Sequence, residues 1–225
     1  MTGDSVCPGP DSGFACCRSN FHAALPKFVE SMWMELMWGG YMACAYGECL
    51  LRTPEMTIRE SGSYPRGNKV KFEFLDVVHG DWWPIVLRKP RGCRSVAARL
   101  NGKPVKWPNG GCFNGPWRKG DVIELEFDMP VREWTGPRDE KSYLRGPLLY
   151  SLPIQTTEIP HPGKGIRKDF PKVELKPRSE CDFAVKDGAR VVGDGVIEVG
   201  GCRLVPVADT QLRRSVHPFP EGETP

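Results

Sequence analysis

The stretch Lys69-Val70-Lys71-Phe72-Glu73-Phe74-Leu75 decides the fold class, because its charged and apolar residues alternate with a period of two. Successive side chains of a β-strand point to opposite faces of a sheet. The pattern therefore predicts a strand with one buried face and one solvated face. The segment Val122-Ile123-Glu124-Leu125-Glu126-Phe127 alternates in the same way. Both segments favour an antiparallel sheet that is exposed to water on one side.

Short strands and turns continue on both sides of these segments. Asn101-Gly102 is a strong hairpin signal, and Tyr64-Pro65-Arg66-Gly67-Asn68 and Trp117-Arg118-Lys119-Gly120-Asp121 read as turns. Further strands are expected at 57–60, 83–90, 97–100, 105–107, 148–152, 173–175, 191–192, 196–199, 203–207 and 211–213. Their spacing predicts a mainly β fold, an antiparallel β-sandwich or jelly-roll. Residues 153–172, with four prolines, are expected to form a surface excursion.

One helix is expected at residues 20–38, after a loop at 1–19. Asn20 is its predicted N-cap and Gly39-Gly40 its end. Its apolar residues follow the spacing of one buried face; they are Phe21, Leu25, Phe28, Val29, Met32, Trp33, Leu36 and Met37. The rest of the sequence offers no second strongly helical segment to cover this face. We therefore expect the 21–37 face to dock on polypeptide outside this chain, or on a second copy, rather than on the β region.

Composition narrows the function classes. The net charge of +3 is small and the 31 basic residues form no stripe, which argues against a nucleic-acid partner. No apolar run is long enough to cross a bilayer, and the first residues lack the pattern of a signal peptide. The nine cysteines are odd in number and follow no disulfide-scaffold spacing. They favour a reducing, cytoplasmic location.

The vicinal pair Cys16-Cys17 is the unusual chemical feature. It is predicted to lie just before a helix N-terminus, where the helix dipole favours the thiolate. Thiolate is both a nucleophile and a zinc ligand, but one pair supplies at most half of a closed tetrahedral zinc site. Cys7 and His22 are close enough in sequence to complete such a set. The alternative is that both cysteines are structural residues of a helix-entry loop.

Other candidates have simpler explanations. His79-Gly80-Asp81 and Trp82-Trp83 offer a surface on which a carbohydrate could stack. In a strand the two tryptophans would point to opposite faces, so one of them is expected in the core. Asp139-Glu140 is typical of a solvated turn, and Glu30 and Glu35 fall on the polar side of the expected helix. None of these needs a catalytic role.

The run Phe14-Ala15-Cys16-Cys17-Arg18-Ser19-Asn20 before an amphipathic helix resembles the Cys-Cys-x-x-Asn segment of glycoside hydrolase family 127 (GH127), the β-L-arabinofuranosidases and their relatives. Downstream landmarks resemble the family in the same order. They are Tyr64-Pro65 before a strand, Leu87-Arg88-Lys89-Pro90 in place of a Leu-Arg-Ile-Pro run, Leu100-Asn101-Gly102, Trp117-Arg118-Lys119-Gly120-Asp121, Met129-Pro130 and Arg145-Gly146-Pro147-Leu148-Leu149-Tyr150. The ordered series spans nearly the whole chain.

This resemblance implies an (α/α)6 barrel with the active site, followed by β-sandwich domains. Residues 1–40 would be a loop and helix left from that barrel, and 41–220 the C-terminal β-sandwich region. The family binds zinc through one glutamate and three cysteines, which implies Cys16 as nucleophile and zinc ligand and Cys17 as zinc ligand. Retaining hydrolysis of a sugar linkage follows, with a glutamic acid that protonates the leaving oxygen.

The sequence departs from the family at the rest of the zinc site. The glutamate, the third cysteine and the acid/base glutamate belong to an upstream Glu-x-Cys region, which nothing in this sequence matches. We therefore expect a chain that is catalytically incomplete alone. Two alternatives remain open: a non-catalytic β-sandwich that binds carbohydrate or assists assembly of a partner chain, and a small zinc or redox protein.

Overall fold

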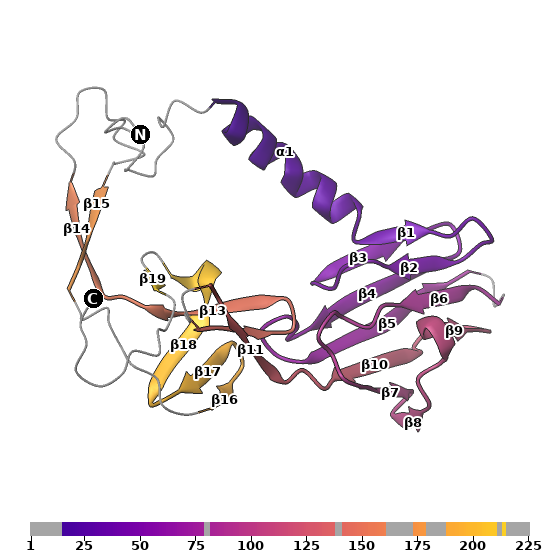
Figure 1. Cartoon of the computed structure of the whole chain (residues 1–225). Coiled ribbons are helices and arrows are strands. Elements are labelled where there is room, and N and C mark those ends of the chain that lie inside the picture. Colours follow the sequence, from indigo (N-terminus) through magenta and orange to yellow (C-terminus); the bar gives the residue numbers. More distant parts are fainter. Residues whose placement is uncertain are drawn as a thin grey trace.

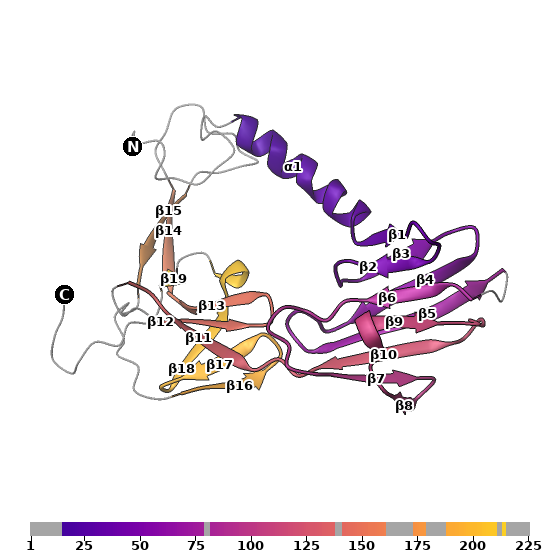
Figure 2. The same ribbon diagram turned by 45° about the vertical axis from the view of Figure 1, so that its right-hand side comes forward.

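The computed structural model describes residues 15–78, 82–137, 141–160, 173–178, 188–210 and 213–214. The chain begins there with helix α1 (Ala15–Glu30), which is followed by strands that make up almost all of the remaining regular structure. The fold is mainly β, as predicted, and its strands pair antiparallel except for β2 and β6. Helix α1 projects away from the strands and meets them only at its C-terminal end (Figures 1 and 2).

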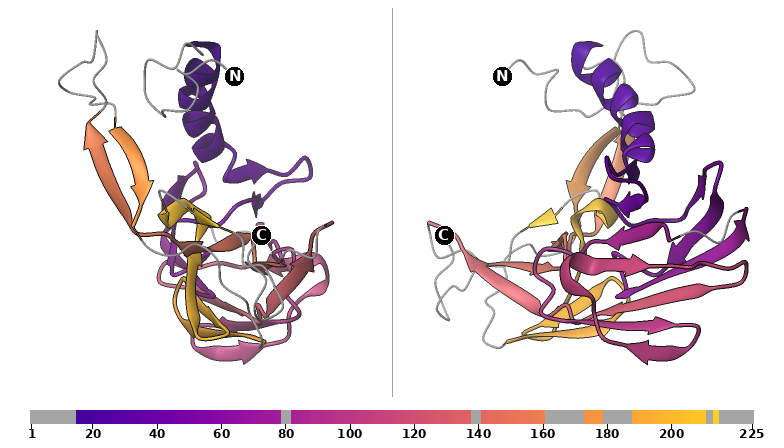
Figure 3. Two further views of the ribbon diagram at one scale, coloured as in Figure 1. Left: turned by 60° about the vertical axis from the view of Figure 1, so that its left-hand side comes forward. Right: turned by 90° about the vertical axis from the view of Figure 1, so that its right-hand side faces the viewer.

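Two sheets make up the first half of the fold. One has the order β1-β2-β6-β9 and the other β3-β4-β5-β10-β7-β8. The first sheet contains β1 (Trp33–Glu35), β2 (Tyr41–Ala43), β6 (Pro84–Leu87) and β9 (Cys112–Asn114). The second contains β3 (Cys49–Arg52), β4 (Met56–Gly62), β5 (Lys69–Val77), β7 (Val96–Leu100), β8 (Lys103–Val105) and β10 (Val122–Phe127). Figure 3 shows these strands lying in layers.

The inward-facing side chains of both sheets form one hydrophobic core. Val70, Phe72 and Phe74 of β5 are buried, and the residues between them face outward. Strand β10 repeats this alternation, so the predicted period of two is confirmed. The other sheet contributes Ile85 and Leu87, both nearly inaccessible. Burial of such side chains contributes roughly 1.5–3 kcal/mol each, and it fixes the strand register.

A third sheet, with a second core, follows. Its order is β11-β12-β13-β18-β17-β16, with β19 (Arg213–Arg214) paired to β13. Its strands are β11 (Val131–Thr135), β12 (Lys141–Arg145), β13 (Leu148–Pro153), β16 (Ala189–Gly193), β17 (Val196–Val199) and β18 (Cys202–Pro206). Tyr143, Tyr150, Ile197, Val199 and Leu204 form its buried cluster. The described residues of the range 41–220 therefore form two hydrophobic clusters.

A two-stranded ribbon lies within the predicted surface excursion. Strands β14 (Thr156–Pro160) and β15 (Val173–Pro177) pair antiparallel and project from the third sheet (Figure 1). Residues 161–172 lie outside the described part of the chain. The Pro-rich composition of 153–172 masked the strand at 156–160, because its residues Thr156, Thr157 and Ile159 favour extended structure in spite of the flanking prolines.

The two cores are joined through Arg145. Its Nη1 donates to the carbonyl oxygen of Arg66 at 2.8 Å, and its Nε donates to that of Met129 at 3.3 Å. The backbone N–H of Gly195 donates to the same Arg66 carbonyl at 2.9 Å. The Arg66 side chain bonds the carboxylate of Asp209. The junction is therefore polar, and most of its bonds end on backbone atoms.

The N-terminal helix differs from the prediction. It starts by Ala15 and ends at Glu30, so residues 15–19 are helical and Asn20 lies inside the helix instead of capping it. Residues 33–35 form β1, paired with β2, and the carbonyl of Met32 accepts the N–H of Cys44 at 2.8 Å. These tertiary hydrogen bonds override the helical spacing of the apolar residues. The predicted loop at 1–14 lies outside the described residues.

Other parts of the fold prediction have no test in the structure. The jelly-roll or sandwich connectivity, the origin of α1 in an (α/α)6 barrel, and the division at residues 40 and 41 stay predictions. In the described part of the chain, no helix combines the length and the hydrophobicity that a membrane crossing requires.

We predict that Leu204→Ala destabilises the protein by about 2–5 kcal/mol, because it leaves a cavity in the small second core. Urea unfolding measures the loss. The matched control is Leu149→Ala, at a side chain that is 44% exposed, for which a change of less than about 0.5 kcal/mol is expected. Equal losses in the two variants would contradict the assignment of Leu204 to a packed core.

Candidate functional site

Cys16 lies in the first turn of α1, at the end of the helix that is remote from the strands (Figure 1). Its side chain is exposed. With a rise of about 1.5 Å per residue, the helix places Cys16 roughly 20 Å from its C-terminal end at Glu30. The cysteine is thus held away from both β cores. Cys17 follows it in the same turn, and its side chain lies outside the described residues.

The described residues do not assemble a zinc site around Cys16. His22 is exposed on the same helix, but it lies six residues further, about 9 Å along the axis and on another face. Cys7 lies outside the described residues. Within the described ranges, no group of three or more His, Cys, Asp or Glu side chains is arranged to hold a metal. These residues alone therefore do not fit the tetrahedral set that zinc requires.

Trp82 and Trp83 point to different environments, as the sequence indicated. Trp82 is 71% exposed, whereas Trp83 packs against the first core and its carbonyl accepts the indole N–H of Trp117 at 2.7 Å. Residues 79–81 and 139–140 lie outside the described residues. Glu30 and Glu35 are both exposed, but Glu35 lies in β1 and not in the helix where it was predicted, because the helix ends at Glu30.

Glu60 is a buried acidic residue that the sequence interpretation did not single out. It lies on β4, on the same face of the strand as Met56 and Ile58. Its side chain faces the first core and is 2% exposed. Its Oε2 accepts the indole N–H of Trp33 at 3.1 Å, and its Oε1 accepts the backbone N–H of Gly47 at 2.9 Å. This carboxyl group therefore joins β1, the 44–48 loop and β4.

Burial controls the ionisation of this group. Desolvation raises the pKa of Glu60 to about 7, and the hydrogen bonds from Gly47, Cys49 and Trp33 oppose the rise. The Cys49 thiol, 3.6 Å from Oε2, has its pKa raised to about 11 by burial and by Glu60. The pKa of Tyr46 is also raised, mainly by desolvation. Around neutral pH, Cys49 and Tyr46 stay neutral, and Glu60 is the group that titrates.

The surroundings of Glu60 indicate a structural role and not the role of an acid catalyst. The hollow that it lines has a volume of about 40 Å³, far below the roughly 300–1,000 Å³ of small-molecule sites. Both carboxyl oxygens already accept hydrogen bonds from the protein. Glu60 therefore does not replace the acid/base glutamate that a glycosidase needs.

Apolar surface gathers around α1 and its junction with the strands. Phe21, Leu25, Phe28 and Val29 of α1 are all more than half exposed. Beside the C-terminal end of the helix lies an open hollow of about 650 Å³, lined by Val29, Glu30, Met32, Trp33, Glu48, Cys49, Leu50, Leu51 and Arg52. We call α1 and this hollow the helix surface. Trp33 and Cys49 line the hollow and also bond Glu60, so the Glu60 carboxyl group lies directly beneath the hollow.

Solved structures identify the general class of this fold. A chain described as a glycoside hydrolase has 19% identical residues and a TM-score of 0.61, over 94% of this chain and 42% of its own length. A GH127 β-L-arabinofuranosidase from Geobacillus stearothermophilus T6 has 16% identity and a TM-score of 0.55, over 85% of this chain and 34% of its own. This chain thus spans less than half of either structure. At these identities the likeness concerns the fold.

A sequence match covers part of the chain. Residues 41–129 match the model described as the middle domain of GH127 β-L-arabinofuranosidase. The same residues, from Tyr41 to Met129, form the first hydrophobic core. Residues 41–129 are therefore similar to a GH127 middle domain, and the resemblance to the family is confirmed over this range. No curated protein sequence matches the chain.

We predict that the unfolding free energy falls as pH rises from about 5 to 7. In this window folded Glu60, with a pKa of about 7, binds more protons than the unfolded chain, where its pKa is near the usual 4.5. The loss should reach about 2–3 kcal/mol. Urea unfolding at several pH values measures it. Glu60→Gln should flatten the dependence, and the exposed control Glu48→Gln should leave it unchanged; a wild-type slope in Glu60→Gln would contradict the assignment.

Proposed function

We propose that this chain is the C-terminal portion of a GH127-type glycoside hydrolase whose whole form cleaves β-L-arabinofuranosyl or similar sugar linkages. The observation that carries the proposal is the family match over 41–129, which coincides with one complete hydrophobic core. A match that follows a physical core indicates a shared domain, whereas a short shared motif would not. The substrate class is that of the β-L-arabinofuranosidase family whose middle domain matches, and it is part of the proposal.

Cys16 is the proposed nucleophile, and Cys16 and Cys17 are proposed zinc ligands. The support is their place in the first turn of α1, where the Cys16 side chain is exposed. Zinc bound there would supply Lewis-acid chemistry and hold the thiolate. The chain's own part would be to present the thiol of Cys16 at the anomeric carbon, as the nucleophile of a retaining mechanism.

The proposal includes catalytic incompleteness of the described portion. A retaining glycosidase needs a second carboxyl group near the nucleophile, at about 5–5.5 Å where both groups are carboxyls. Glu30, the acidic residue of α1, lies about 20 Å from Cys16 along the helix. Glu60 is buried on β4, near the C-terminal end of the helix. The acid/base group would therefore come from polypeptide other than the described residues.

The helix surface is the proposed contact with that polypeptide. Isolated helices of this length are marginal in water, and packing of an apolar face normally stabilises them. In the described structure the helix from Phe21 to Glu30 is exposed on all sides. The catalytic region of the whole enzyme is the proposed occupant of this surface, because the solved structures extend well beyond the part that this chain covers.

A second candidate function is a non-catalytic module that binds carbohydrate or assists assembly of a partner chain. The exposed helix surface favours the assembly role, and the exposed Trp82 favours contact with a sugar. We propose a cytoplasmic location for either function. Its support is that Cys44, Cys49, Cys93, Cys112 and Cys202 carry free thiols, as expected in a reducing compartment.

We predict that the purified 225-residue chain contains much less than one zinc ion per molecule, and that Cys16→Ser does not change this content. It should also show no turnover of a nitrophenyl β-L-arabinofuranoside, with or without added zinc. Elemental analysis and absorbance of released nitrophenol provide the two measurements. One zinc per chain that is lost in Cys16→Ser, or clear zinc-dependent turnover, would refute catalytic incompleteness.

We predict that the chain alone associates through the helix surface. The double variant Phe21→Ser with Phe28→Ser should lower the weight-average mass measured by light scattering during size-exclusion chromatography, because it removes two exposed aromatic side chains. Leu149→Ser, at an exposed position of the third sheet, is the control and should leave the mass unchanged. A strictly monomeric wild-type chain would count against docking by this surface.

A further inference from the structure

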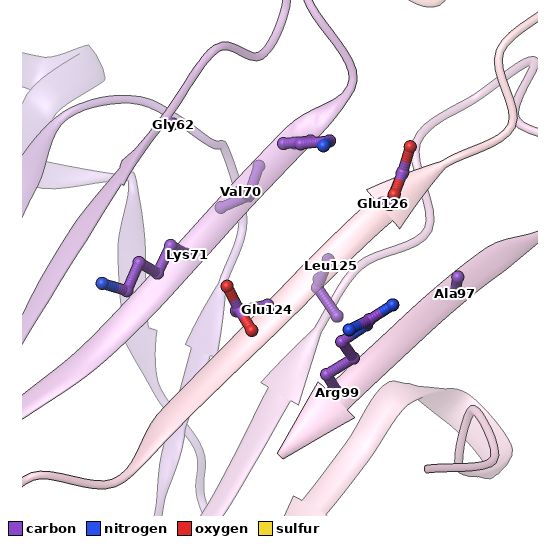
Figure 4. Close-up of a pocket in the computed structure, with 9 residues that line it drawn as sticks. Gly62, Val70, Lys71, Ala97, Arg99, Glu124, Leu125 and Glu126 are labelled. Carbon is purple, nitrogen blue, oxygen red and sulfur yellow. The ribbon is translucent and has the colours of Figure 1, made fainter. Parts of the chain in front are cut away.

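A second hollow, of about 460 Å³, opens on the outer face of the six-stranded sheet. Figure 4 shows Glu124 and Glu126 on β10, with Lys71 of β5 on one side and Arg99 of β7 on the other. These side chains face away from the first core, whereas Leu125 of the same strand is buried. The volume lies within the roughly 300–1,000 Å³ of small-molecule sites. Nothing in the proposed catalytic role uses this face.

Two small residues line the hollow. Ala97 lies opposite Glu126 in the β10–β7 register, and Gly62 lies opposite Val70 in the β4–β5 register. Gly62 has a φ of +142°, and a Cβ atom there would lie 2.3 Å from the carbonyl oxygen of Lys69. Only glycine fits such a close approach of two strands. On the outer face the small residue is therefore Ala97, beside the long polar side chains, whereas Gly62 allows the close approach of β4 and β5 at the edge of the hollow.

The charged side chains around the hollow do not neutralise one another. Glu124 lies directly opposite both Lys71 and Arg99 in the strand register. Opposite charges in such positions normally pair across a sheet. Here the Nζ of Lys71 bonds Glu73 at 2.8 Å instead. In the described part of the chain, neither Glu124 nor Arg99 makes a side-chain hydrogen bond or an ion pair within 4.0 Å.

We propose that this hollow is a saccharide-binding site, in which the Glu124 carboxylate and the Arg99 guanidinium hydrogen-bond to neighbouring hydroxyl groups of one sugar unit. A sugar hydroxyl both donates and accepts, so it matches a rim that offers acceptors and donors side by side. Three basic and two acidic residues line the hollow, a near balance that does not suit a polyanion. The small side chain of Ala97 leaves room on the outer face for the ring of the sugar.

The site adds a sugar contact to the proposed function. Only the choice of an arabinose-containing probe rests on that proposed function. No aromatic side chain lines the hollow, so the stacking that strengthens many sugar sites is missing. We therefore expect weak binding, with a dissociation constant on the order of 1 mM. Weak binding suits the retention of a polymeric substrate, where several contacts act together.

The test is a titration of the isotope-labelled 225-residue chain with a short arabino-oligosaccharide, followed by amide chemical shifts. Shifts should change at residues 62, 69–71, 97–99 and 124–126 and stay constant on α1 and in the third sheet. Arg99→Ala and Glu124→Ala should each weaken binding about tenfold, the loss typical of one charge-assisted hydrogen bond. Ala97→Gln should abolish binding, because its side chain fills the hollow.

The matched control is Arg59→Ala, on the same outer face but outside the lining of the hollow. It should bind as the wild type does. All four positions are exposed, so the fold should persist, and unchanged amide spectra elsewhere will verify this. No shift change at millimolar probe, or equal weakening by Arg59→Ala, would overturn the proposal. The result is independent of zinc content and turnover, so failure of the site is distinct from failure of the proposed enzyme function.

Discussion

The alternation of side chains along β5 and β10 is the constraint on which the rest of the structure depends. Each inward residue closes the core against the opposite sheet, and each outward residue joins a charged row on the solvent side. A shift of one residue would exchange the two sets completely. The same register therefore determines both the packing of Phe72 and the position of Glu124 beside the outer hollow. The packing of the core and the charge pattern of the outer face therefore both follow from the pairing of β5 with β10.

Within that apolar core, Glu60 is the polar exception. A buried carboxyl group costs free energy unless donors surround it, and three protein donors do so here. Two of those donors, Trp33 and Cys49, also line the hollow at the base of α1. The direction in which α1 leaves the strands thus depends on a hydrogen-bonded group in the core. The exposed cysteine at the far end of the helix depends on the same attachment.

The sequence predicted the strands well wherever a period of two or a turn signal was present, as at β5, β10 and the Asn101-Gly102 hairpin. It predicted the helix poorly after Glu30, because the apolar spacing of Met32 and Trp33 is compatible with a helix face. Pairing with β2 and the bond to Glu60 decide the outcome, and both partners are distant in sequence. Glu60 itself was detectable: Met56, Ile58 and Glu60 alternate, which places the acid on the inward face. The outer hollow was not detectable, since it depends on which strands become neighbours.

Arg145 joins the two cores mainly through backbone carbonyl groups. A carbonyl oxygen is present whatever side chain a position carries, so this bond places no demand on the identity of residues 66 and 129. Either core can then accumulate substitutions without a matching change in the other. The arrangement permits the two halves of the β region to diverge at different rates during evolution while their mutual orientation is retained. A family model that ends at Met129, where the first core ends, is consistent with this independence.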